Sequence, residues 1–190
     1  MERHIMLPLT EETARSLHMG DSVYLSGVIY TARDAAHERM IDGLAEGKAI
    51  PFDSKDAVIY YVGPSPAKPG QVIGSAGPTT SGRMDKWAPT MLALGARGMI
   101  GKGARSKEVI EAMKEYGGVY FGAIGGAGAL LAKCIKKSEL IAYEDLGPEA
   151  IRKLTVEELP LLVLIDADGR NLYEEGRAEY LKGREQKGVS

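Results

Sequence analysis

The stretch Gly77-Pro-Thr-Thr-Ser-Gly-Arg-Met-Asp85 carries three consecutive hydroxyls, two glycines and an arginine. It lies between an expected strand, residues 71–75, and an expected helix that begins near Met84. A loop at such a junction can direct backbone N–H groups, hydroxyls and a guanidinium at one point, as proteins do to bind a carboxylate or a phosphate. The stretch therefore predicts a site for a small anion at a strand-to-helix junction.

Outward from this loop, the second half of the chain alternates between strands and helices, whereas the first half is rich in strands around one helix. Strands are expected at residues 23–31, 57–62, 71–75, 98–100, 119–123, 140–143 and 161–165. Helices are expected at residues 10–17, 34–45, 84–94, 106–116, 128–133 and 148–154, and a turn at 166–169 should join a final β pair. The pattern predicts an α/β fold with a mixed sheet, flanking helices and barrel-like β packing. We expect one domain, residues 1–190, with a charged tail from about residue 175.

The composition excludes several classes of protein. The chain has 190 residues, of which 44% are hydrophobic and 6% aromatic, so one core that is mainly aliphatic is expected. A net charge of −2 with mixed signs argues against nucleic acid as the main partner. The lone Cys134 excludes a disulfide framework, cannot hold a metal cluster by itself, and is interpreted as a small buried residue rather than a reactive thiol. Without an apolar run that suits a signal peptide or a membrane span, a cytoplasmic location is expected.

Three cationic side chains stand at expected strand-to-helix junctions: Arg33, Arg83 and Lys102. Ligands of open α/β folds bind beyond the carboxyl ends of the strands, so these side chains could gather at one edge around a small dianion. Two alternatives stay open. Arg33 could pair with Asp34 or Glu38 on the surface, and Lys102 could be a solvated turn residue.

The loops themselves have further interpretations. Thr80 or Ser81 could cap the following helix, although capping explains one hydroxyl and not three. A nucleotide-binding P-loop is rejected because Gly103 stands where a Ser or Thr would reach magnesium. A dinucleotide turn at residues 122–128 is disfavoured because its glycines miss the required register.

Four motifs together make the chain similar to a known family. The loop 77–85, Thr31-Ala-Arg-Asp-Ala-Ala-His37, Tyr61-Val-Gly-Pro64 and Gly101-Lys-Gly103 occur in the order and spacing of class I fumarases and L(+)-tartrate dehydratases. The chain resembles their β subunit, or the C-terminal domain of the single-chain fumarases, from about Leu7 to the charged tail. The resemblance implies a swivelling β/β/α fold. It also implies a hydro-lyase that adds water to fumarate to give L-malate, or that dehydrates a related hydroxy diacid.

The resemblance also implies roles for single residues. Thr79 and Lys102 match catalytic positions of the family. Thr79 matches the proposed base, which takes the proton from the carbon next to the departing hydroxyl. Lys102 matches a residue that also holds a substrate carboxylate. Arg33 and Arg83 match positions that hold substrate carboxylates, and Thr80, Ser81 and Gly82 of the same loop as Arg83 are expected to bind substrate as well. Fixed cations beside that carbon would act mainly on the transition state, because removal of the proton builds negative charge on the neighbouring carboxylate.

The resemblance implies that the metal lies on another chain. In that family a 4Fe–4S cluster is held by three cysteines of the other subunit, and its open iron acts as a Lewis acid on the leaving hydroxyl. We therefore expect no metal ligand in this chain, an obligatory cluster-bearing α subunit, and a higher-order hetero-oligomer without nucleic acid or membrane. Fumarate hydratase is the expected activity. The alternatives are an L(+)-tartrate dehydratase β subunit, a non-catalytic dicarboxylate-binding domain and, least favoured, a nucleotide-binding oxidoreductase fragment.

Overall fold

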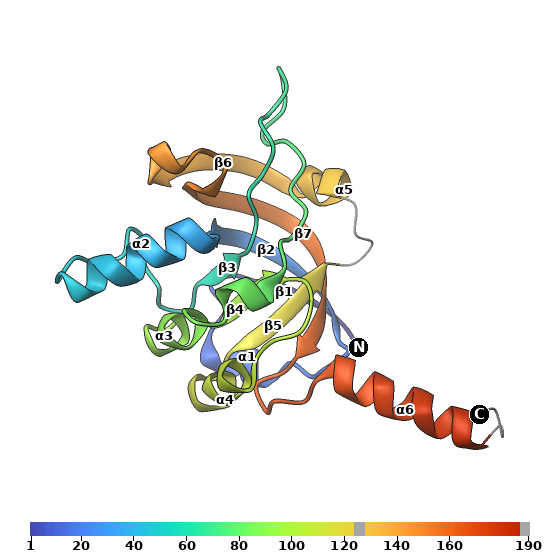
Figure 1. Cartoon of the computed structure of the whole chain (residues 1–190). Coiled ribbons are helices and arrows are strands. Elements are labelled where there is room, and N and C mark those ends of the chain that lie inside the picture. The colour runs from blue at the N-terminus through green and yellow to red at the C-terminus, as the bar shows by residue number, and fades with distance from the viewer. Residues whose placement is uncertain (124–127, 187–190) are drawn as a thin grey trace.

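The computed structural model describes residues 1–123 and 128–186, and within them strands form one mixed sheet (Figure 1). The strands are β1 (Glu2–Met6), β2 (Ser22–Thr31), β3 (Val58–Tyr60), β4 (Gly98–Gly101), β5 (Val119–Ala123), β6 (Ile135–Ala142) and β7 (Ile151–Ile165). The helices are α1 (Glu11–Arg15), α2 (Asp34–Ala45), α3 (Ala88–Ala93), α4 (Lys107–Tyr116), α5 (Gly128–Lys133) and α6 (Leu172–Gln186). Two 3-10 helices, η1 (Ser81–Met84) and η2 (Glu144–Glu149), complete the described elements.

The sheet closes into a barrel because β7 pairs with both β2 and β5, the first and last strands of the parallel run β2-β3-β4-β5. Strands β1 to β5 lie parallel to their neighbours in chain order, and β7 runs antiparallel to both β5 and β2. Leu161 of β7 is paired with Val23 of β2 on one side and with Ala123 of β5 on the other. This closes the ring β2-β3-β4-β5-β7 and confirms the predicted α/β fold with a mixed, barrel-like sheet and flanking helices.

The central parallel strands bury both of their faces. In β5, Val119 and Phe121 belong to the core inside the barrel, whereas Tyr120 between them belongs to the core outside it. Strand β3 repeats this arrangement, with Tyr60 inside and Ile59 outside. Such strands read as continuous apolar runs because neither face meets water. The expectation of an aliphatic core is incomplete, since tyrosines are among its largest fully buried side chains.

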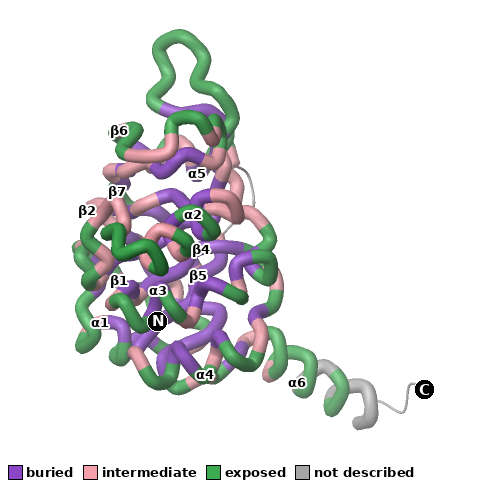
Figure 2. The backbone as a smooth tube through the Cα atoms, turned by 60° about the vertical axis from the view of Figure 1, so that its left-hand side comes forward, coloured by how far each residue is buried: buried purple, intermediate pink, exposed green. Residues whose placement is uncertain are grey.

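Helices α2, α3 and α4 cover the outer core, and α6 extends away from the body (Figure 1). Each covering helix contributes a buried methionine: Met40, Met91 and Met113. Helix α4 begins where the hydroxyl of Ser106 accepts the N–H of Val109. Most of the described part of α6 is exposed (Figure 2), so the charged tail is helical but is not part of the core.

The predicted strand at residues 71–75 is wrong. These residues belong to a long loop that rises from the body and is largely exposed around its tip (Figures 1 and 2). The facing segment carries Pro64, Pro66 and Pro69, which have no N–H to donate to a ladder. The two sides of the loop are joined at its base, where Ser65 N–H donates to the Ser75 carbonyl at 3.0 Å.

The predicted helix at residues 148–154 is also wrong, because most of it lies in the 15-residue strand β7, which includes the predicted strand 161–165. The pairing of β7 with β2 and β6 overrides the weak helical pattern. Two other elements differ in extent. The helix predicted at 84–94 is divided into η1 and α3, and the final β pair is a single bridge between Ile165 and Asn171.

The position of Leu161 inside the closed ring leads to a stability prediction. Leu161→Ala should lower the free energy of unfolding by about 2–5 kcal/mol, because it leaves a cavity in a fully buried site. Leu140→Ala, at a residue 41% exposed on β6, is the control and should cost less than about 1 kcal/mol. Urea unfolding followed by circular dichroism measures both, and equal losses would contradict the assignment of Leu161 to the barrel core.

Candidate functional site

The carboxyl ends of the parallel strands lie at one edge of the barrel, and the loops that follow them meet there. Arg33 follows β2, Tyr61 follows β3, and Lys102 follows β4. The N–H of Tyr61 donates to the carbonyl of Ile100 at 2.9 Å, which extends the pairing of β3 with β4 into the loops. The edge is therefore formed by segments that are far apart in the sequence.

Residues 79–81 lie against the loop after β4 like a short additional strand. The N–H of Thr79 donates to the carbonyl of Tyr61 at 2.7 Å, and the N–H of Lys102 donates to the carbonyl of Thr79 at 3.3 Å. The N–H of Ser81 then donates to the carbonyl of Lys102 at 2.9 Å, and Thr80 forms a parallel bridge with Lys102. These backbone bonds hold Thr79 and Lys102 side by side.

Arg83 extends from η1 toward the first turn of α2. Its Nε and Nη2 atoms both lie 2.8 Å from Oδ2 of Asp34. The Nε atom of Arg33 lies 3.9 Å from the other oxygen of Asp34 and 3.8 Å from Oε1 of Glu149. The two arginines thus gather around one carboxylate, and Glu149, rather than Glu38, is the second carboxylate beside Arg33.

The underside of the loop is closed by Ser81, whose side chain is fully buried. The hydroxyl of Tyr120 lies 2.8 Å from Oγ of Ser81 and 2.9 Å from the carbonyl oxygen of Gly103. Because a carbonyl only accepts, Tyr120 donates to Gly103 and accepts from Ser81. A Cβ at Gly101 would stand 1.8 Å from this Oγ, so glycine is required there. The Ser81 hydroxyl points inward, and its assignment to substrate binding stays a prediction.

A buried ion pair joins the end of the loop to the start of α4. Arg105, with a fully buried side chain, donates from Nε to Oδ1 of Asp85 at 2.7 Å, and Ser106 N–H donates to Oδ2 at 2.6 Å. The guanidinium also donates to the hydroxyl of Tyr61 at 3.3 Å and lies over the rings of Tyr61 and Tyr120. Burial raises the pKa of both tyrosines, so their hydroxyls stay protonated as donors.

His37 lies in α2 one turn after Arg33 and is fully buried. Its Nδ1 is 2.8 Å from the carbonyl oxygen of Arg33, and its ring stacks on Trp87 with centroids 5.8 Å apart. Burial lowers the pKa of His37 to about 4, so the ring is neutral at pH 7. The neutral ring donates from Nδ1, and its bare Nε2 is buried without a partner within the described residues.

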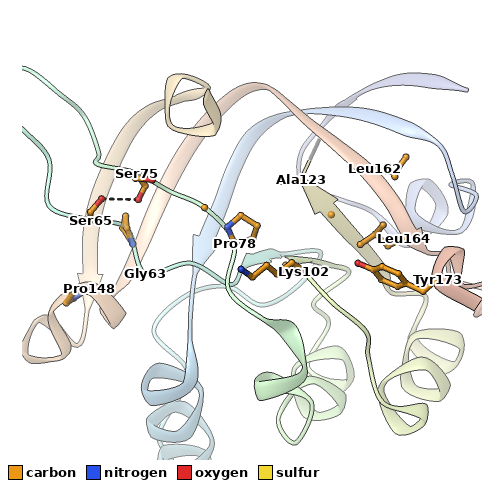
Figure 3. Close-up of a pocket in the computed structure, with 14 residues that line it drawn as sticks. Gly63, Ser65, Ser75, Pro78, Lys102, Ala123, Pro148, Leu162, Leu164 and Tyr173 are labelled. Atoms are coloured by element: carbon orange, nitrogen blue, oxygen red, sulfur yellow. Dashed lines mark hydrogen bonds between the residues drawn. The ribbon is translucent and has the colours of Figure 1, made fainter. Parts of the chain in front are cut away.

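A cavity of about 590 Å³ opens beside this edge (Figure 3). Lys102 and Pro78 form one side, and Leu162, Leu164 and Tyr173 form an apolar wall opposite. The volume of this cavity is larger than a small diacid requires. Among the described residues, the arginine pair does not belong to its lining.

The structure brings most of the predicted site residues to one edge, but it does not present them all to solvent. Lys102, Thr80 and Gly82 are exposed, and Thr79 is half-buried. The capping alternative is not supported, because Thr80 makes no side-chain cap bond. Arg105 was missed because its role depends on Asp85, and no local motif joins two residues 20 positions apart.

The potential metal ligands of the described residues do not lie together. Cys134 is a half-buried free thiol immediately before β6, and burial raises its pKa. Among the side chains that the structure describes, which leave out residues 124–127, 179–180 and 183–190, no three His, Cys, Asp or Glu gather into a metal site. The described part of the chain therefore does not fit a 4Fe–4S cluster by itself. The same part has no helix with the length and apolarity to cross a membrane, and residues 124–127 of the disfavoured dinucleotide turn lie outside it.

Comparison with known proteins gives a consistent result. The family model described as Fumarase C-terminus matches residues 2–176. A Methanocaldococcus jannaschii protein, provisionally named L(+)-tartrate dehydratase subunit beta, is 40% identical over 88% of this chain and 89% of its own length.

Fumarate hydratases match as well. The aerobic class I fumarate hydratase of Escherichia coli is 41% identical, and the mitochondrial fumarate hydratase 1 of Leishmania major is 42% identical, each over 80% of this chain. The match covers 28% of the length of either enzyme. This chain thus corresponds to a part of those proteins and to nearly the whole of the archaeal one.

The contact between Ser81 and Gly101 leads to a prediction about the loop. Gly101→Ala should destabilise the protein, because its Cβ would overlap Oγ of Ser81. Gly82→Ala is the matched control for stability, since its Cβ would meet the Ala104 carbonyl oxygen at an ordinary 3.8 Å.

The double variant Gly101→Ala/Ser81→Ala removes the overlapping oxygen and should regain part of the loss. Thermal unfolding of the three variants measures this. A double variant no more stable than Gly101→Ala would contradict the contact.

The buried neutral His37 predicts a pH dependence of stability. In the unfolded chain His37 is protonated near pH 6.5, whereas in the folded protein it is protonated only near its lowered pKa of about 4. The stability that this group contributes is therefore complete above pH 6.5 and is lost as the pH falls to about 4, by about 3 kcal/mol. Between pH 6.5 and pH 4, the free energy of unfolding of His37→Phe, measured by urea unfolding, should therefore fall by about 3 kcal/mol less than that of wild type. The exposed His18, changed to Gln, is the control and should keep the wild-type loss.

Proposed function

Because this chain belongs to the Fumarase C-terminus family, we propose that it is the β subunit of an iron–sulfur hydro-lyase that works with a cluster-bearing α subunit. Its reaction is the addition of water to fumarate to give L-malate. The observation that carries the proposal is the convergence of Thr79, Lys102, Arg33 and Arg83 on one edge of the barrel. We further propose a cytoplasmic, higher-order hetero-oligomer.

In the proposed mechanism the cations of this chain act on the substrate carboxylates. A diacid carries two negative charges, and guanidinium groups bind carboxylates through two parallel hydrogen bonds. Lys102 lies within the cavity wall beside the loop, where it would face the carboxylate next to the reacting carbon. Negative charge grows there as the proton leaves, so a fixed cation stabilises the transition state more than the ground state.

Thr79 is the proposed base of the dehydration direction, and it returns the proton in hydration. A threonine hydroxyl is a weak base, so its alkoxide needs strong stabilisation. The backbone bond between Lys102 and Thr79 holds these two residues side by side, and the Lys102 ammonium would supply part of that stabilisation. Thr80 and Gly82 would contact the substrate from the same loop. Ser81 stabilises this loop through the hydrogen bond between its buried hydroxyl and that of Tyr120.

The proposal places the 4Fe–4S cluster on the α subunit, because Cys134 is the single cysteine of this chain. When bound there, the cluster would supply Lewis acidity toward the leaving hydroxyl. The residues of this chain would bind and orient the diacid, move the proton at Thr79 and exclude water from the cavity.

L(+)-tartrate dehydration is the second candidate. It is supported by the archaeal relative, which matches over 89% of its own length and is named for that activity. Both reactions remove water from a hydroxy diacid, so they require the same charge pattern. The substrates differ by one hydroxyl, and comparison of the two turnover rates decides between them.

The test is co-purification of this chain with the cluster-bearing subunit under anaerobic conditions, followed by assays with fumarate and L(+)-tartrate. Turnover of either substrate supports the hydro-lyase, and the faster one identifies it. A cluster-loaded complex that converts neither would refute the proposal. Tight binding of L-malate to the isolated chain would then favour a dicarboxylate-binding domain.

The role of Arg83 leads to a kinetic prediction. Arg83→Ala should lower kcat/KM of the complex about 100-fold, which corresponds to about 3 kcal/mol for a lost charged partner. Arg83→Lys should restore only part of it, because the planar fork is absent. Arg177→Ala on the exposed part of α6 is the control and should keep full activity. Full activity in Arg83→Ala would remove Arg83 from the site.

A further inference from the structure

The two arginines of the site are held in different ways. Arg33 is enclosed: a Cβ at Gly63 would stand 2.9 Å from its Nη1, and Glu149 lies beside its Nε. Arg83 is 55% exposed, and within the described residues its side chain is bound by Asp34 alone. The position of Arg83 relative to Arg33 therefore depends on Asp34.

The contact between Asp34 and Arg83 uses one side of the guanidinium. Oδ2 of Asp34 lies 2.8 Å from both Nε and Nη2, and within the described part of the chain Nη1 has no hydrogen-bond partner. A guanidinium has a second edge, formed by Nη1 and Nη2, that binds a carboxylate through two bonds. Asp34 thus engages the side of Arg83 and leaves that edge available.

The backbone fixes the carboxylate that does this. Asp34 is the first residue of α2, where the partial positive charge of the helix terminus favours an acid. Its Oδ1 is buried without a hydrogen-bond partner among the described residues and lies 3.9 Å from Nε of Arg33. One short side chain on a rigid element therefore faces both guanidinium groups.

The charges around the arginines balance before any substrate is present. Arg33 and Arg83 contribute two positive charges, and Asp34 and Glu149 contribute two negative ones. Among the side chains that the structure describes, which leave out residues 179–180 and 183–190, no carboxylate forms an ion pair with Lys102. A dianion thus meets little net charge at the arginine pair, and its binding depends on how the free guanidinium edges are oriented.

We propose that Asp34 is a positioning residue, which holds the side of Arg83 so that its Nη1–Nη2 edge is presented beside Arg33 to a substrate carboxylate. The proposal rests on the proposed function for the identity of the substrate. The orientation of Arg83 by Asp34 does not, and it can be tested separately.

The first experiment measures the orientation in the isolated chain. The Nε–Hε proton of Arg83, assigned by its absence in Arg83→Lys, should exchange slowly with water in wild type because it is donated to Asp34. In Asp34→Asn the exchange should become several-fold faster. In Glu38→Gln, which removes the same charge one turn further along α2, it should stay at the wild-type rate. Unchanged exchange in Asp34→Asn would overturn the proposal.

The second experiment measures kinetics in the complex with the cluster-bearing subunit. Asp34→Asn should lower kcat for fumarate about tenfold, because the guanidinium edge is no longer aligned with the transition state. KM should not rise, because the variant also removes a negative charge that opposes the dianion. Glu38→Gln should leave both constants unchanged.

The outcomes separate the proposals. A raised KM with unchanged kcat in Asp34→Asn would mean that the residue contributes only to ground-state binding, and it would overturn the positioning role. If Asp34→Asn loses kcat and also has a lower melting temperature, Asp34→Ser is measured as well, because serine keeps a hydrogen-bond acceptor at the start of α2. Asp34→Ser should show the same loss of kcat without a rise in KM. If it does not, the positioning role is overturned. If the wild-type complex is inactive, the proposed function fails, and the exchange experiment alone still decides the role of Asp34.

Discussion

The antiparallel insertion of β7 between β2 and β5 is the constraint on which the rest of the structure depends. The parallel run β2-β3-β4-β5 has two ends, and β7 pairs with both of them as one strand, as the two partners of Leu161 demonstrate. Closure fixes the twist of the array and therefore the relative positions of the loops after β2, β3 and β4. The residues that share the carboxyl edge come from those loops, so their proximity follows from pairing on the far side of the barrel.

The loop from Gly77 to Asp85 depends on polar contacts in the interior more than on its own sequence. Burying a guanidinium is unfavourable unless its donors are satisfied, and Arg105 is satisfied by Asp85 and Tyr61. The missing side chain at Gly101 provides the space that Ser81 occupies. The exposed surface of the loop is thus built on a close-packed and fully hydrogen-bonded base.

Local patterns predicted much of this structure. Helix α2 and strand β5 have the expected bounds, because the spacing of buried residues in each is set by its own geometry. The edge could be anticipated because each cation follows a strand. The loop at 71–75 was mistaken for a strand because the prolines that prevent pairing lie in the facing segment. The contact of Asp34 with Arg83 joins residues 49 positions apart, so no periodicity reveals it.

The position of Trp87 has an optical consequence. Its indole is the only one in the chain, and it stacks on the ring of His37, one turn from Arg33. The ammonium of Lys86 lies over the same indole, 4.1 Å from the ring centroid. The tryptophan emission of the protein therefore comes from a single place beside the arginine pair. The molecule carries its own fluorescent reporter of the helix that supports the site, and no label has to be attached to follow that helix when another subunit or a diacid arrives.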